Sequence, residues 1–151
     1  MGWNGHHLAE IVVDGNKYTS DELFSDNEYE ASSFTVEKVF KMGTIGEFNY
    51  DFSDSWEHYF FVKDVLIDSK IETPFCTKCK GKCPPDECGG LRSFHSLVTI
   101  LTNPNHPEYF NYSECFDEGF DPHDVSIDQI NKDIKDLFLQ NVYVNPKNIY
   151  V

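Results

Sequence analysis

The strongest constraint on the fold is a stretch in which aromatic and polar residues alternate. Within residues 46–53, Phe48, Tyr50 and Phe52 are separated by polar side chains. Successive side chains of a strand point to opposite faces, so this pattern predicts a strand with one aromatic and one polar face. A turn at Asp54-Ser55 and a second, richly aromatic run at 56–66 complete a predicted hairpin. Because the second arm is apolar on both faces, we expect it near the centre of the sheet.

The chain before this hairpin has a second strand signal. An apolar-rich run at residues 7–13 ends at the turn pair Asp14-Gly15, and Lys17-Tyr18 begins the expected return strand. Residues 19–33 are polar and acidic, which predicts an exposed loop. Residues 35–40 predict one short helix.

The chain after the hairpin is predicted to be helical in three segments. The first has Ser93 as its N-cap and ends at Asn103-Pro104. The second starts at Asn105, which can serve as its cap. In the third, Ser126 and Gln129 form a capping box ahead of an apolar stripe.

Together these patterns predict an α+β fold, in which an antiparallel sheet from the first half is packed by helices from the second half. Residues 1–140 are expected to form a single domain that includes a metal loop at 74–90. The tail at 141–151 has strand character, and Pro146 in its middle suits a sheet edge.

Charge limits the function. The chain has 151 residues, with 12 Lys+Arg against 26 Asp+Glu, for a net charge of −14. Residues 1–68 carry 14 acids and 4 bases, so −10 of that charge lies there. Such a surface does not suit phosphate backbones or anionic lipid, so neither DNA nor membrane binding is expected. No signal peptide or membrane span is recognised, and the expected location is the cytoplasm.

Four cysteines, in the arrangement C-x2-C-x3-C-x4-C, predict a metal site. They are Cys76, Cys79, Cys83 and Cys88. Thiolates bind Zn²⁺ tetrahedrally, so we expect one closed, structural zinc site in loop 74–90. The lysines of this loop are expected to favour thiolates over thiols.

A weaker set of candidates is catalytic. His7, Asp51 and His58 offer the imidazole and carboxylate groups of a metal-dependent hydrolase. Their spacing argues against tight clustering, because Asp51 and His58 lie on opposite arms of the predicted hairpin. The expectation is therefore that they are structural, and that the protein is not an enzyme.

Several ordered sequence blocks carry a family resemblance. The blocks are Met1-Gly2-Trp3 with His7-Leu8, Tyr50 through His58, Cys83 through Gly90, Asn103 through Glu108, Phe120-Asp121-Pro122, and Asn131. On these blocks the chain resembles the plasmid pRi Orf-three-like family, whose members also carry the name insertion-element passenger TnpR proteins. The resemblance implies an α+β fold and an association with mobile elements. Taken literally, the TnpR name means a resolvase, but the single arginine, Arg92, does not support that activity.

The chain departs from the family pattern at three places, one of which is Ser53, where the family usually has a glycine in the hairpin motif. Family members begin with a strand and a helix ahead of the Met-Gly-Trp block. We expect the tail at 142–151 to take that sheet edge or to pair with another chain, which would make a homodimer. Cys79 is an addition relative to the family, so a complete four-cysteine site is a property of this sequence.

The predicted function is that of a small, acidic, zinc-containing protein-interaction or regulatory module. Its partner is expected to be a protein. Because this chain is acidic, that partner is expected to be basic. One alternative is an acidic inhibitor or nucleic-acid mimic that occupies a basic groove. The second alternative is the hydrolase that uses His7, Asp51 and His58.

Overall fold

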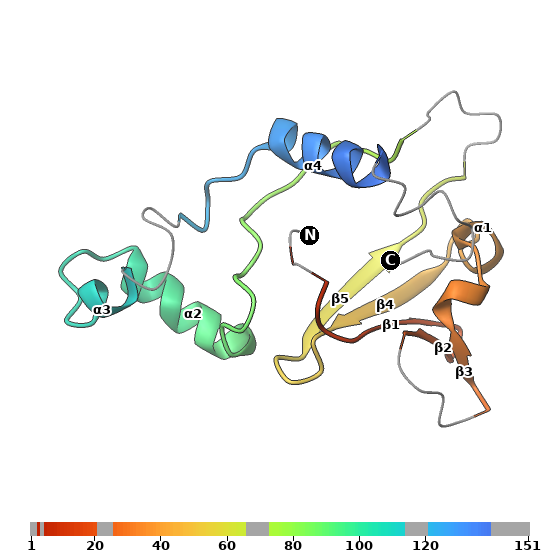
Figure 1. The fold of residues 1–151 in the computed structure, drawn as a ribbon, viewed down its shortest axis with the longest axis horizontal. Helices are drawn as coiled ribbons and strands as arrows, with labels where there is room; N and C mark the ends of the chain where they lie inside the picture. The colour runs from red at the N-terminus through yellow and green to blue at the C-terminus, as the bar shows by residue number, and fades with distance from the viewer. Residues whose placement is uncertain (1–2, 4, 21–25, 66–72, 114–120, 140–151) are drawn as a thin grey trace.

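The computed structural model describes residues 3, 5–20, 26–65, 73–113 and 121–139, and these form a sheet followed by helices (Figure 1). The tail strand expected at 141–151 lies outside the described residues. The elements, in chain order, are β1 (Ala9–Val13), β2 (Asn16–Thr19), β3 (Glu28–Glu30), the 3-10 turn η1 (Ala31–Ser33), α1 (Val36–Val39), β4 (Ile45–Tyr50), β5 (Trp56–Phe61), α2 (Gly90–Leu101), α3 (Tyr109–Ser113) and α4 (Ile127–Leu139).

The sheet has the strand order β3-β2-β1-β4-β5. Both predicted hairpins are present. β1 and β2 meet at a two-residue turn, where Asp14 and Gly15 have φ of 51° and 78°, the conformation that a tight hairpin turn needs. The expectation of a purely antiparallel sheet is wrong, because β3 pairs with β2 in parallel. This mixed sheet includes a strand within the segment expected to be a loop, since a three-residue strand carries no periodic signal.

The apolar sequence of β5 predicts a central strand. In the structure β5 instead forms an edge of the described sheet (Figure 1). On the face of β5 away from Trp56 and Phe60, the side chains of Tyr59 and Phe61 are 71% and 61% exposed. The central strand is β1, whose Ile11 and Val13 are buried. Apolar residues on both faces of β5 are therefore not enough to place this strand at the centre of the sheet.

The two faces of the sheet differ in cover. The covered face carries Ile11 and Val13 of β1 and every second residue of the β4–β5 hairpin, and it is overlaid by side chains from outside the sheet. These contacts are Trp3 on Tyr50, Phe34 on Tyr18 and Tyr29, Phe40 on Phe60, and Phe94 on Trp56. The opposite side of the hairpin, the open face, carries Ile45, Glu47, Asn49, Glu57, Tyr59 and Phe61. Burial on folding is thus concentrated on one side of the sheet.

The predicted helices are present, with two starts shifted. α3 begins at Tyr109, four residues after its expected cap Asn105. α2 begins at Gly90, three residues before the expected cap Ser93, and no side chain caps it. At α4 the backbone N–H of Gln129 donates to Ser126 Oγ at 3.2 Å, as the capping box predicts. The Gln129 side chain does not complete the box but donates to Asp133 instead.

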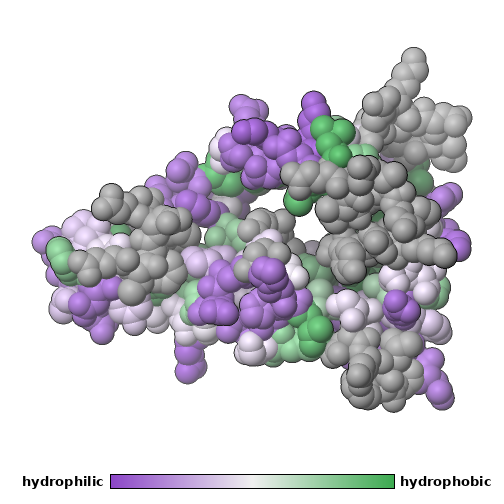
Figure 2. Space-filling model, in the orientation of Figure 1, coloured by the Kyte–Doolittle hydropathy of each residue, from purple (hydrophilic) through white to green (hydrophobic). Residues whose placement is uncertain are grey.

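The helices of the second half do not cover the sheet as expected. α2 packs against α3 and contacts the sheet through Phe94 on Trp56, at the hairpin end. The space-filling view shows an open gap between α4 and the sheet, and exposed apolar side chains at the C-terminal end of α4 (Figure 2). The α+β class is confirmed, but the two halves meet through loops. Within the described residues no helix has the length and apolar character needed to cross a membrane.

Candidate functional site

The candidate site begins at the loop that joins β4 to β5. Tyr50 pairs with Trp56, so five residues, 51–55, make the turn where two were expected. Asp51 and Ser55 both have φ of 54°, in the left-handed region. Asp51 Oδ1 accepts hydrogen bonds from the Ser53 hydroxyl, the Ser53 N–H at 3.0 Å and the Asp54 N–H at 3.3 Å. The Asp51 carboxylate therefore holds the loop in shape.

The surroundings of Asp51 stabilise its negative charge. The side chain is almost completely buried, and Oδ2 lies 3.6 Å from His7 Nδ1. The hydrogen bond from Ser53 is the main cause that lowers the pKa of Asp51, and the N–H groups of Asp54 and Ser53 and the nearby His7 add to it, against burial, which raises it. Asp51 is thus an anion at neutral pH, with Oδ1 bonded to the turn and Oδ2 facing His7.

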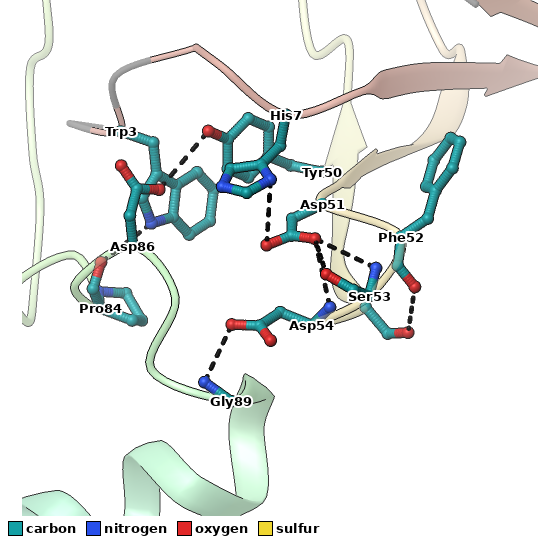
Figure 3. A network of polar contacts seen from close by, with 11 residues as sticks. Trp3, His7, Tyr50, Asp51, Phe52, Ser53, Asp54, Pro84, Asp86 and Gly89 are labelled. Atoms are coloured by element: carbon teal, nitrogen blue, oxygen red, sulfur yellow. Dashed lines mark hydrogen bonds and ion pairs between the residues drawn. The ribbon is translucent and has the colours of Figure 1, made fainter.

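The residues from Cys83 to Gly90 close over this loop from outside the sheet (Figure 3). The Trp3 indole N–H donates to the Pro84 carbonyl oxygen at 2.9 Å, and the Tyr50 hydroxyl donates to Asp86 at 3.4 Å. The Gly89 N–H donates to Asp54 Oδ2 at 3.0 Å. We call the hairpin loop, the 83–90 segment, Trp3 and His7 together the junction.

Gly90 shows how closely the two segments approach. A Cβ there would lie 2.5 Å from the carbonyl oxygen of Asp54, and the φ of Gly90 is +73°. Both the contact and the conformation require glycine. The first residue of α2 is thus in close contact with the hairpin loop, which explains why the helix starts at this position.

An aromatic cluster fills the junction. The Trp3 ring stacks on Tyr50 at a centroid distance of 4.5 Å and contacts His58 edge-on at 5.4 Å. The His7 ring contacts the Tyr50 ring edge-on, at a centroid distance of 5.7 Å. Burial and the carboxylate of Asp86 raise the pKa of Tyr50, which keeps its hydroxyl protonated as a donor.

Of the three candidate catalytic residues, the structure brings two together. His7 and Asp51 are neighbours, whereas His58 Nδ1 lies 3.0 Å from the carbonyl oxygen of its cross-strand partner Phe48. A carbonyl only accepts, so this nitrogen carries the proton. Nowhere in the described ranges do three or more His, Cys, Asp or Glu side chains gather as at a metal site. The hydrolase stays a prediction: His7 and Asp51 belong to the junction, and His58 lies in β5 against the Phe48 carbonyl.

The four cysteines do not form one site in this structure, although the spacing predicts it. All four are free and partly exposed. Within the described residues, no three of the four sulfurs gather as at a metal site. Zinc binding stays a prediction.

The thiols are also more basic than the lysine-rich sequence suggests. Burial raises the pKa of Cys83 to about 11, and the pKa of Cys88 is raised by burial and then by Asp54. Partial burial and the adjacent Cys76 raise the pKa of Cys79. The lysines of the loop are exposed, so water screens their charge while burial and nearby acids act on the sulfurs.

The cysteine loop joins the sheet to α4. The Asn131 side chain accepts from the Cys76 N–H at 2.6 Å and donates to the Cys76 carbonyl at 3.0 Å. The Lys82 N–H donates to the carbonyl oxygen of Pro122 at 2.8 Å. One amide side chain thus satisfies both backbone groups of a loop residue across 55 positions of sequence.

Residue-by-residue reasoning missed the bonding roles of Trp3, Asp86, Gly89 and Asn131. No periodicity or spacing rule marks them. They do lie in the blocks that carry the family resemblance, and those blocks meet at the junction and at Asn131. The blocks are therefore the signal that could have located the site.

The open face is the second surface to consider. Ile45 is 68% exposed and lies opposite Phe61 in the β4–β5 pairing, next to Tyr59. On this face Glu47 lies opposite Tyr59, and Glu57 lies two residues before Tyr59 in β5. The result is an apolar strip with carboxylates beside it.

Comparisons with known proteins agree with this fold and with the sequence blocks. A sequence model of the family described as "Plasmid pRiA4b ORF-3-like protein" matches residues 1–129. "Uncharacterized protein y4hQ" of Sinorhizobium fredii (strain NBRC 101917 / NGR234) is 27% identical over 141 residues, covering 91% of this chain and 73% of that protein. The crystal structure of MM3350, a protein of unknown function from Methanosarcina mazei Go1, matches with a TM-score of 0.73 and 21% identity, over 85% of this chain and 75% of that one. Because the family model covers residues 1–129, the chain belongs to the plasmid pRiA4b ORF-3-like family.

Proposed function

We propose that the protein is a non-enzymatic interaction module that binds a basic, apolar segment of a protein partner through its open face. The observation that carries the proposal is the exposure of Ile45, Tyr59 and Phe61 side by side on one rigid hairpin. Side chains of this size on a sheet surface usually mark a contact site, and aromatic residues dominate the energetics of such sites.

The charge around the strip indicates the partner's chemistry. Glu47 and Glu57 flank the exposed aromatic residues, and the first 68 residues hold most of the net negative charge. Complementary charge steers encounter, while the apolar strip supplies the buried contact. A segment in which Lys or Arg alternates with apolar residues fits both requirements.

The junction supports this reading rather than a catalytic one. The carboxylates of Asp51 and Asp54 accept hydrogen bonds from within the junction, and Trp3 and Tyr50 are committed to Pro84 and Asp86. Groups with these partners stabilise the end of the hairpin that carries the open face. The association with mobile elements, which the family's plasmid name suggests, is part of the proposal.

A pair of labelled peptides tests the proposal. One alternates Lys or Arg with Phe or Leu, and its twin has Glu in place of each base. Fluorescence anisotropy should show the basic peptide binding, with affinity that falls from about 50 to about 500 mM NaCl, and no binding of the acidic twin. Equal binding of the twins, or none of either, would overturn the proposal.

A double variant separates the interaction module from a nucleic-acid mimic. Tyr59→Thr with Phe61→Thr removes the apolar strip and keeps every charge, so binding of the basic peptide should fall at least about tenfold. A mimic that binds by charge alone would keep its affinity. Phe110→Thr, a change at an equally exposed aromatic residue on α3, is the matched control and should bind like the wild type.

A further inference from the structure

The outer edge of β5 presents backbone groups at alternate positions that make no strand pairing within the described part of the chain. Val62 donates its N–H to the Thr44 carbonyl at 2.9 Å and accepts from the Gly43 N–H at 2.8 Å, so its backbone faces β4. Because backbone groups alternate in direction along a strand, those of Glu57, Tyr59 and Phe61 point away from the sheet. No strand of the described ranges pairs with this edge.

The edge has little of the protection that sheet edges normally carry. Natural edges are short, carry charged side chains or prolines, or are interrupted by bulges or inward charges. β5 is six residues long, has no proline, and presents Tyr59 and Phe61 in a regular register with β4. The charged residues lie near the two ends of the edge. Glu57 is near one end, and Lys63 is near the other, two residues beyond the strand. Both side chains are exposed.

We propose that two copies of this chain join edge to edge through antiparallel pairing of β5, with Phe60 at the two-fold axis. In this register Tyr59 lies opposite the partner subunit's Phe61, and Phe61 lies opposite the partner subunit's Tyr59. Glu57 then faces the partner subunit's Lys63, and Lys63 faces the partner subunit's Glu57. The proposal goes beyond the interaction function, which needs only one copy.

The charges select this register. Directly opposed residues on an antiparallel pair interact, and opposite charges stabilise the pair while mismatches do not. A two-fold axis at Tyr59 would place Glu57 opposite the partner subunit's Phe61, and an axis at Phe61 would place Lys63 opposite the partner subunit's Tyr59. Only the axis at Phe60 pairs both charges and both exposed aromatic residues.

The backbone geometry accepts the same register. The residues of β5 whose backbone groups point outward are odd-numbered, and the proposed register pairs odd with odd, so Glu57, Tyr59 and Phe61 fall at the hydrogen-bonded positions. Lys63 meets the partner subunit's Glu57 through its side chain, two residues beyond the strand. Phe60 falls at the close, non-hydrogen-bonded position on the covered face, where it already contacts Phe40. The assembly would be one continuous sheet whose two open faces form a single surface.

Charge exchange provides the experiment, with sedimentation velocity of the full chain at about 100 μM and low salt. The wild type should be a dimer. Glu57→Lys and Lys63→Glu should each weaken it by roughly tenfold, because like charges then oppose each other. The double variant should restore the dimer, as should an equimolar mixture of the two single variants, which can form only the mixed pair. A monomeric wild type, or single variants as dimeric as the wild type, would overturn the proposal.

A photocross-link checks the register. With p-benzoylphenylalanine at position 59 and an isotopically labelled second copy, the product should join position 59 to the partner subunit's Phe61. A cross-link to the partner subunit's Tyr59 would overturn the register. These measurements use no peptide, so a monomer would remove the dimer and leave the peptide-binding test of the proposed function intact.

Discussion

The two ends of the β4–β5 hairpin differ in almost every physical respect. At the turn end, Tyr50 and Trp56 are buried, and the loop is held by Asp51 and by the 83–90 segment. At the other end, Ile45 and Phe61 face each other across the strands with most of their surface in water. The same two strands thus supply a structural anchor at one end and an unoccupied surface at the other.

The contrast shows that apolar content alone does not tell which end is the core. Both ends are rich in large side chains, but Tyr50 and Trp56 lie on the covered face under Trp3 and Phe94, whereas Ile45 and Phe61 lie on the open face. Substitutions at the turn end should therefore cost folding free energy, and substitutions at the open end should not. The following predictions test that division, from the largest expected effect to the smallest.

Gly90→Ala should have the largest effect. The added Cβ would meet the Asp54 carbonyl oxygen at a residue with positive φ, so we expect a loss of about 3 kcal/mol in the free energy of unfolding. Urea denaturation measures this loss. Gly43→Ala is the control, because Gly43 also has positive φ but no atom within 4 Å of the added Cβ, and it should lose only about 1 kcal/mol. Equal losses would show that the close approach at the junction carries no energy.

Trp3→Ala should cost about 2–3 kcal/mol, because it removes the stack on Tyr50 and the hydrogen bond to Pro84. Trp3→Phe keeps a stacking ring and loses only the N–H donor, so about 1 kcal/mol is expected. Thermal unfolding monitored by circular dichroism would rank the two. If Trp3→Phe were as damaging as Trp3→Ala, the stack would not be what holds the N-terminal segment in place.

Asp51→Asn should cost about 1.5 kcal/mol at neutral pH, because the loop loses hydrogen bonds to a charged acceptor. The folded pKa of Asp51 is lowered, so its stabilisation is present above the ordinary pKa of an aspartate, near 4, and is lost as the pH falls through the lowered folded value. The difference between wild type and variant should therefore shrink below about pH 4.

The matched control for Asp51 is Asp14→Asn. Asp14 has nearly the same φ, 51°, in the β1–β2 turn, but it is exposed. Urea titrations of both variants at several pH values would compare them. A pH-independent loss at Asp51 would mean that its shape matters and its charge does not.

Tyr59→Thr should have the smallest effect, within about 0.5 kcal/mol, because the ring is mostly in water and threonine keeps the β propensity. Chemical denaturation at low protein concentration measures the isolated chain. A loss above about 1 kcal/mol would show that the open face is packed in the folded protein and is not free to bind.

Sequence reasoning predicted the elements that carry a strong local signal. The alternation in β4, the Asp14-Gly15 turn and the Ser126 cap of α4 are all confirmed. Each depends on a residue and its near neighbours, which is the information that a single sequence contains. The start of α2 was misplaced because Gly89 and Gly90 owe their backbone shape to contact with Asp54, not to a capping side chain.

The site was harder to predict because strand alternation stops where the site begins. Extending the pattern of β4 puts Asp51 on the polar face, away from Tyr50. The strand ends at Tyr50, and the positive φ of Asp51 redirects its carboxylate toward Ser53 and His7. Neither this redirection nor the arrival of Asp86 and Gly89 leaves a periodic trace, so only the structure shows them.

The order of strands along the chain has a consequence for synthesis. All five strands lie within residues 9–61, and every described strand pairing is made between them. A ribosome releases these residues first, so the sheet can pair before the 83–90 segment exists to close its turn end. During that interval Trp56 lacks Phe94 and Tyr50 lacks Asp86, while the edge of β5 is already formed. The nascent sheet is therefore most exposed to other chains before its anchor is made, and we expect chaperone contact to fall once residue 94 has emerged.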